Sequence, residues 1–114
     1  MSLQTVVLVV LAVAAWFFLF RYGKTSSSEA HRLVAAGARL VDVRTPGEFS
    51  GGALPGAINI PLDQLSARVG ELTKEPGKPV VLYCASGMRS GQARRLLTGA
   101  GLAEVYDLGG MGRW

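Results

Sequence analysis

Cys84 is the residue of this chain whose type and position are best suited to chemistry, and it is the single cysteine. It follows the apolar run 79–83 and precedes a loop that contains Gly87 and leads into a helical stretch. We therefore expect a thiol at the carboxyl end of a buried strand and at the amino terminus of a helix. Unpaired amides and the positive end of the helix dipole favour a thiolate and an anionic substrate at such a place. Considered alone, a single cysteine is more often a small buried apolar residue, and it is the following loop that favours a reactive thiol here.

The loop after Cys84 is suited to holding an anion. To turn its amides toward the sulfur it must curve, and Gly87 can adopt a positive φ without steric cost. Successive inward amides form an anion-binding nest, and Arg89 adds a permanent charge with a fork of donors. Together these groups would stabilise a thiolate, or a persulfide that carries its charge on the outer sulfur. The candidate substrate-binding residues are Ala85, Ser86, Gly87, Met88 and Arg89.

Composition excludes several classes of protein. With one cysteine, the chain of 114 residues has no intrachain disulfide and no cysteine-rich zinc site. His31, the single histidine, excludes a multi-histidine metal centre, and we expect it to be an ordinary residue on a helix surface. The net charge of +4 is small, and no basic stripe alternates with aromatic residues, so we expect no nucleic-acid partner. We predict neither a metal nor a cofactor.

The apolar segment 3–20 predicts a single-pass membrane anchor. It has no charged side chain, and as a helix it would measure about 27 Å, close to the thickness of a bilayer core. A buried core helix is the first alternative, but a domain this small could not surround a helix that is apolar on all sides. A cleaved signal peptide is the second alternative, and it lacks a basic start and a small-residue cleavage site after the apolar run.

The charges that flank this segment predict its orientation. Arg21 and Lys24 follow the apolar run, so the positive-inside rule predicts that the remaining domain faces the cytoplasm. We therefore divide the chain into residues 1–24, a transmembrane anchor with its basic flank, and residues 25–114, a globular domain.

Helices and strands are expected to alternate through residues 25–114. Ser26 and Glu29, and again Thr45 and Glu48, have the spacing of helix-capping boxes. The patterns predict helices over 26–36, 45–51, 62–72 and 90–100, and strands over 39–43, 57–60, 80–83 and 103–108. This order predicts an α/β fold with a small parallel five-stranded sheet flanked by helices on both faces. Ligands of such sheets collect beyond the carboxyl ends of the strands, where Cys84 is expected.

Residues 27–114 resemble the single-domain rhodanese (sulfurtransferase) family. The likeness is carried by four segments in order, namely 40–49 (LVDVRTPGEF), 52–62 (GALPGAINIPL), 81–90 (VLYCASGMRS) and 108–114 (LGGMGRW). The resemblance implies that Cys84 forms a persulfide and that the backbone of residues 85–89 holds the transferred sulfur. It also implies that Asp42 and Arg44 mainly support the scaffold. Many relatives have a histidine at the position of Ala53, a difference that bears on substrate choice.

Beside this resemblance, Arg44 and Glu48 bracket a turn. We therefore expect the two side chains to pair and Glu48 to support the scaffold as well.

The leading hypothesis for function is a sulfurtransferase. Cys84 would take a sulfane sulfur from a small anionic donor, such as thiosulfate or a persulfide, and pass it to a thiol or to cyanide. One alternative is phosphate or arsenate chemistry, but such loops typically hold five residues between cysteine and arginine, and here there are four. The other alternative is a non-catalytic, membrane-tethered module that binds a partner or delivers sulfur.

Overall fold

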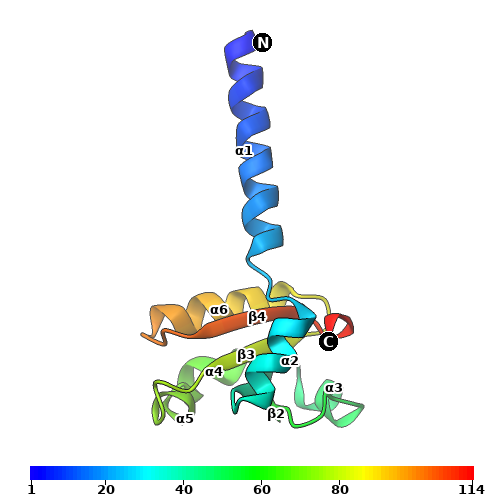
Figure 1. Ribbon diagram of the computed structural model, residues 1–114, viewed down its shortest axis with the longest axis vertical. Helices are drawn as coiled ribbons and strands as arrows, with labels where there is room; N and C mark the ends of the chain where they lie inside the picture. Colours follow the sequence, from blue (N-terminus) through cyan, green and yellow to red (C-terminus); the bar gives the residue numbers. More distant parts are fainter.

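Four strands form one parallel sheet in the computed structural model, which describes residues 1–16 and 23–114. The strands are β1 (Arg39–Asp42), β2 (Ile58–Asn59), β3 (Val80–Cys84) and β4 (Val105–Gly110), in the spatial order β2-β1-β3-β4. The remaining elements are α1 (Leu3–Tyr22), α2 (Ser27–Ala35), α3 (Pro46–Ser50), α4 (Leu62–Arg68), α5 (Gly70–Thr73), α6 (Met88–Gly99) and the short 3₁₀ helix η1 (Met111–Arg113). Figure 1 shows α1 extending away from the α/β domain, and its large apolar side chains from Leu3 to Trp16 are exposed.

The predicted α/β class with a parallel sheet is confirmed, but the predicted number of five strands is wrong. The four segments predicted as strands are the four that pair, and the predicted ends differ from the observed ones by at most two residues. The described chain between these segments folds into helices and turns, so it supplies no fifth extended segment. The helix predicted over 62–72 is divided into α4 and α5, and the helix predicted to begin at residue 90 begins at Met88.

The predicted membrane anchor and membrane localisation are also wrong. Within residues 1–16 and 23–114, no helix is both long enough and apolar enough to cross a bilayer. Residues 17–20 of the predicted span, together with Arg21 of its basic flank, lie outside the described residues. Lys24, the other residue of that flank, contacts the α/β domain through Asp107 of β4.

Side chains of β3 alternate between two cores, one on each face of the sheet. Val80, Leu82 and Cys84 belong to the core that also contains side chains of α4, α5 and α6. Val81 and Tyr83 belong to the core on the opposite face, which contains side chains of α2. All five residues of β3 are buried, as expected for a strand with helices on both faces.

The sheet order places Cys84 at a switch in the direction of the chain. From β1 the chain first adds β2 on one side and then crosses to add β3 on the other. The carboxyl ends of β1 and β3 therefore meet where connections leave toward opposite edges, which is where open α/β sheets bind ligands. Asp42 ends β1 and Cys84 ends β3.

The carboxyl end of β4 supports the loop that follows β3. Cys84 pairs with Gly110, after an irregularity in the register between Leu82 and Tyr83. A Cβ atom at Gly110 would lie 2.8 Å from the backbone oxygen of Ala85. The backbone of β4 can approach the loop this closely because residue 110 has no side chain.

Replacing Gly110 by alanine should therefore strain the loop as well as the strand. We expect Gly110→Ala to lower the free energy of unfolding by about 1–3 kcal/mol, the usual cost of overpacking. Gly99→Ala is the matched control, because nothing lies within 4 Å of a Cβ at Gly99. Urea denaturation of both variants tests this expectation, and equal stability of the two would contradict it.

Candidate functional site

The sulfur of Cys84 lies inside the turn between β3 and α6. The amide of Gly87 donates a hydrogen bond to Sγ at 2.9 Å. The thiol lies 3.6 Å from the hydroxyl of Ser90 and can donate to it, and that hydroxyl donates to the carbonyl of Gly87 at 3.1 Å. Cys84 and Ser90 both have an exposed fraction of 0%. The sulfur is thus surrounded by hydrogen-bonding groups while being closed to solvent.

These hydrogen bonds favour the ionised form of the sulfur. Burial raises the pKa of Cys84, because a thiolate is less stable away from water. Hydrogen bonds from the amide and hydroxyl of Ser90 and from the amides of Gly87 and Ser86 act in the opposite direction and outweigh burial. The net result is a pKa below the ordinary value of a thiol. A sulfur at the amino terminus of a helix, here α6, is a typical site for a reactive thiolate.

The five predicted loop residues occupy different positions around the sulfur. Gly87 has φ of 106°, which confirms the predicted positive φ, and it is the N-cap residue of α6. Ala85, Ser86 and Met88 are exposed, and Met88 is 73% exposed. The rim of the loop is therefore formed by exposed side chains, and its inner surface is formed by backbone amides.

Arg89 lies on α6 and is bound to Glu48 of α3. Its two terminal nitrogens donate to the two carboxylate oxygens of Glu48 at 2.6 and 3.0 Å. The predicted pairing of Arg44 with Glu48 is therefore wrong. Hydrogen bonds from Arg89, followed by the bond from the Thr45 amide, lower the pKa of Glu48 to about 2. Glu48 also completes the predicted capping box of α3 with Thr45.

Asp42 and Arg44 form a buried ion pair at the end of β1. The Nη2 of Arg44 lies 2.7 Å from Oδ2 of Asp42, and it also donates to the carbonyl of Gly52 at 2.7 Å. The side chain of Asp42 is fully buried, and the guanidinium of Arg44 lies over the ring of Tyr83 at 5.8 Å from its centroid. This pair connects the end of β1 to the segment after α3 and to β3, beside Cys84.

Two features of the site were not predicted from the sequence. Ser90 was expected to open a helix, but α6 begins at Met88, so Ser90 lies in its first turn and faces the sulfur. Lys24 was assigned to the basic flank of an anchor, but its ammonium donates to the carbonyl of Gly87 at 3.1 Å. The role of Ser90 could have been predicted by starting the helix directly after Gly87. No local pattern indicates the contact of Lys24, because Lys24 and Gly87 are 63 positions apart in the sequence. Among the described residues, no cluster of three or more His, Cys, Asp or Glu side chains could hold a metal ion.

Comparison with known proteins identifies the family. Residues 26–114 match the rhodanese-like domain. This chain belongs to the rhodanese-like family. The uncharacterized protein YqhL of Bacillus subtilis is 41% identical over 107 residues, which cover 93% of this chain and 83% of that protein. The thiosulfate sulfurtransferase PspE of Escherichia coli is 35% identical over 78 residues, which cover 68% of this chain and 75% of PspE.

A solved structure has the same fold. It is described as rhodanese with anions from E. coli, and it matches with a TM-score of 0.64 and 32% identity. The match covers 68% of this chain and 92% of that one. The rhodanese-like fold and a general sulfurtransferase class are thus supported both by sequence relatives and by a structure.

The buried pair of Asp42 and Arg44 should matter for stability. Arg44→Met would leave the carboxylate of Asp42 buried without its partner, so we expect the free energy of unfolding to fall by about 3–5 kcal/mol. Arg68→Met is the matched control, because Arg68 pairs with Glu71 on the exposed surface and its loss should cost far less. Chemical denaturation compares the two, and a loss of equal size in both would show that burial of the first pair is not important.

The contact between Arg89 and Glu48 should appear in an acid titration. A folded-state pKa of about 2, below the unfolded value of about 4.3, means that this carboxylate stabilises the folded state above the unfolded value. That contribution is lost as the pH falls from the unfolded value through about 2. Carboxyl NMR should show a midpoint near 2 for Glu48, raised toward the ordinary value in Arg89→Met and unchanged in Arg68→Met. An unchanged midpoint in Arg89→Met would exclude Arg89 as the main cause.

Proposed function

We propose that this chain is a sulfurtransferase that carries a sulfane sulfur on Cys84 as a persulfide. The observation that carries the proposal is the 2.9 Å hydrogen bond from the amide of Gly87 to the sulfur of Cys84, at the amino terminus of α6. Thiosulfate or a small persulfide is the proposed donor, and the name of the relative PspE supports thiosulfate. A thiol is the proposed acceptor, with cyanide as its substitute in an assay.

The first half-reaction loads the sulfur. The thiolate of Cys84 attacks the outer sulfur of thiosulfate, and a new S–S bond forms to Cys84. The original S–S bond breaks, and sulfite leaves with its electron pair. The pKa of Cys84 is below that of an ordinary thiol, which raises the fraction of the sulfur present as the attacking thiolate. The outer sulfur of the persulfide carries negative charge, which the loop amides stabilise by hydrogen bonding.

The second half-reaction unloads the sulfur. The acceptor, as a thiolate or as cyanide, attacks the outer sulfur of the persulfide and forms a bond to it. The S–S bond to Cys84 breaks, and its electrons return to Cys84 as a thiolate. The products are a new persulfide or thiocyanate and the starting enzyme. Two steps that share one covalent intermediate give ping-pong kinetics.

We assign different roles to the charged residues. Arg89 supplies positive charge beside the loop, and Glu48 neutralises part of this charge and fixes the guanidinium in place. The amides of residues 86, 87 and 90 and the hydroxyl of Ser90 are therefore the main stabilising groups of the sulfur. The exposed residues Ala85 and Met88 form the rim that a donor meets first. Asp42 and Arg44 hold the end of β1 in position next to β3.

The boundary that we placed between residues 24 and 25, which separates the amino-terminal segment from the globular domain, stays a prediction.

Burial of Cys84 sets a requirement on the reaction. With an exposed fraction of 0%, the sulfur can meet a donor only after groups that cover it move aside. Ala85, Ser86 and Met88 are the exposed residues of the loop. We propose that movement of this segment admits the donor.

The proposal is tested by intact-protein mass spectrometry after incubation with thiosulfate. The wild-type protein should gain the mass of one sulfur atom and release sulfite, and addition of cyanide should return the original mass. Cys84→Ser should show neither the gain in mass nor sulfite release, because it has no thiol. Absence of both signals from the wild-type protein would exclude the proposed activity with this donor, and a gain in mass by Cys84→Ser would exclude Cys84 as the carrier.

A further inference from the structure

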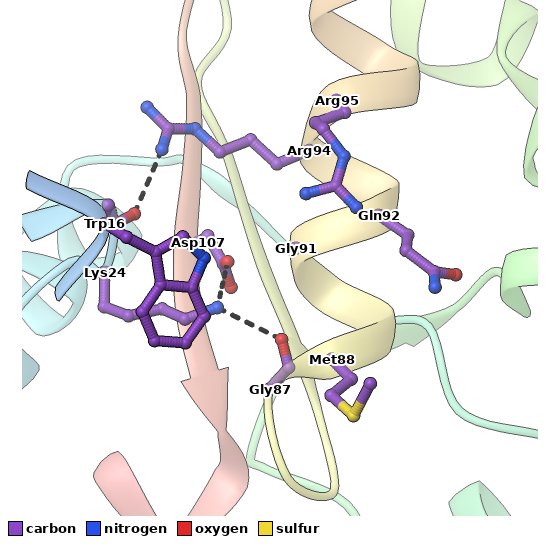
Figure 2. Close-up of a pocket in the computed structure, with 10 residues that line it drawn as sticks. Trp16, Lys24, Gly87, Met88, Gly91, Gln92, Arg94, Arg95 and Asp107 are labelled. Atoms are coloured by element: carbon purple, nitrogen blue, oxygen red, sulfur yellow. Dashed lines mark hydrogen bonds and ion pairs between the residues drawn. The ribbon is translucent and has the colours of Figure 1, made fainter. Parts of the chain in front are cut away.

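Lys24 connects the segment before α2 to the loop that surrounds the sulfur. Figure 2 shows its side chain passing Asp107 and reaching the carbonyl of Gly87. Its Nζ donates to Oδ2 of Asp107 at 2.6 Å and to the carbonyl of Gly87 at 3.1 Å. The two side chains are only 15% and 3% exposed, so water screens this contact much less than it screens a surface ion pair.

The carbonyl of Gly87 has more donors than it can hold well. Besides the ammonium of Lys24, it accepts from the amide of Gly91 at 3.2 Å and from the hydroxyl of Ser90 at 3.1 Å. A carbonyl oxygen has two lone pairs, and three donors compete for them here. The donors from Lys24 and Gly91 are sufficient to satisfy it.

The hydroxyl of Ser90 has one proton and two possible acceptors. It can donate to the carbonyl of Gly87 or, when Cys84 is ionised, to the sulfur 3.6 Å away. If Lys24 were absent, turning toward the sulfur would leave the buried carbonyl with the amide of Gly91 as its one remaining donor among the contacts described, and one lone pair would lack a partner. With Lys24 in place, the hydroxyl can turn toward the thiolate without this loss.

We propose that Lys24 is a positioning residue of the sulfur site, which by binding the carbonyl of Gly87 frees the hydroxyl of Ser90 to donate to the ionised sulfur of Cys84. Asp107 holds the ammonium in this position from β4. This inference rests on the proposed function in one respect, because the proposed function is what gives the thiolate a role in sulfur transfer. The hydrogen-bond exchange itself concerns the free enzyme.

Other charged groups around the loop are held either in ion pairs or by backbone carbonyls. On α6, Arg94 donates to the carbonyl of Gly23 at 3.0 Å, and Arg95 lines the same pocket as Lys24 and Gly87. On the side of β1 the pair is Asp42 with Arg44, and between α3 and α6 it is Glu48 with Arg89. On the side of β4, the guanidinium of Arg113 donates to the carbonyls of Leu108 and Thr25 and packs against Gly109. Lys24 differs from these groups because its ammonium binds both Asp107 and the carbonyl of Gly87 in the loop.

The pH dependence of Cys84 alkylation by iodoacetamide tests the proposal on the full chain. The reaction reports on one residue, because the chain has one cysteine, and it requires no sulfur donor. We expect Lys24→Met to shift the rate profile to higher pH by about 0.5–1 unit, a loss of about three- to ten-fold in thiolate below the pKa. Lys78→Met, which removes a lysine from an exposed pair with Glu75, should leave the profile unchanged.

Making the same substitution in a Ser90→Ala variant separates two effects of Lys24 on Cys84: the effect that acts through the Ser90 hydroxyl, and direct attraction between the ammonium and the thiolate. Ser90→Ala should itself shift the alkylation-rate profile to higher pH. Adding Lys24→Met to Ser90→Ala should cause no further shift. Circular dichroism and thermal unfolding check that each variant is folded. If Lys24→Met does not fold because Asp107 is left unpaired, the double variant K24M/D107N replaces it and the same shift is expected.

The outcomes distinguish this inference from the proposed function. An unchanged profile for folded Lys24→Met would overturn the inference, and so would a shift of equal size whether Lys24→Met is made in the wild-type protein or in the Ser90→Ala variant. In either case, gain of one sulfur by the wild-type protein would leave the proposed function standing. A shift that depends on Ser90 without any sulfur gain would support the inference and count against sulfur transfer.

Discussion

The short connection between β3 and α6 is the constraint on which the site depends. β3 ends at Cys84 and α6 begins at Met88, so the chain must reverse direction within residues 85–87. Gly87 makes this possible with a φ of 106°, and the reversal directs its amide at the sulfur of the strand's last residue. The rest of the fold keeps these two elements in position. β1 and β4 flank β3, and the buried faces of α4 and α6 pack beneath it.

Charge is arranged around the sulfur in pairs that largely neutralise each other. Arg89 is bound by Glu48 and Arg44 by Asp42, so neither guanidinium acts as an unpaired cation beside Cys84. Backbone amides and the hydroxyl of Ser90 therefore provide the nearest stabilisation of negative charge on the sulfur. While the loop is closed over the sulfur, these amides already point toward it, so stabilising negative charge there requires little further ordering. This differs from a site in which a mobile arginine is the main anion-binding group.

Local sequence patterns predicted the elements well, because capping residues, glycines and apolar runs act over a few positions. Ser26 and Thr45 both cap helices as expected, and β3 was found from its continuous apolar run. The pairing of charges could not be predicted in this way. Glu48 is four positions from Arg44 and 41 from Arg89, yet it binds Arg89 because α3 and α6 meet in space. The long apolar segment at the amino terminus gave a prediction of location that the structure does not support.

Burial of the Cys84 sulfur also affects how readily it is oxidised. Thiolates react readily with peroxide, and oxidation beyond the sulfenic acid is generally irreversible. In the resting structure Cys84 has no exposed surface, so an oxidant meets the same barrier as a donor. On the proposed loop movement, the sulfur is exposed only while the loop is displaced. The same cover that delays the donor would then also slow oxidation of the sulfur.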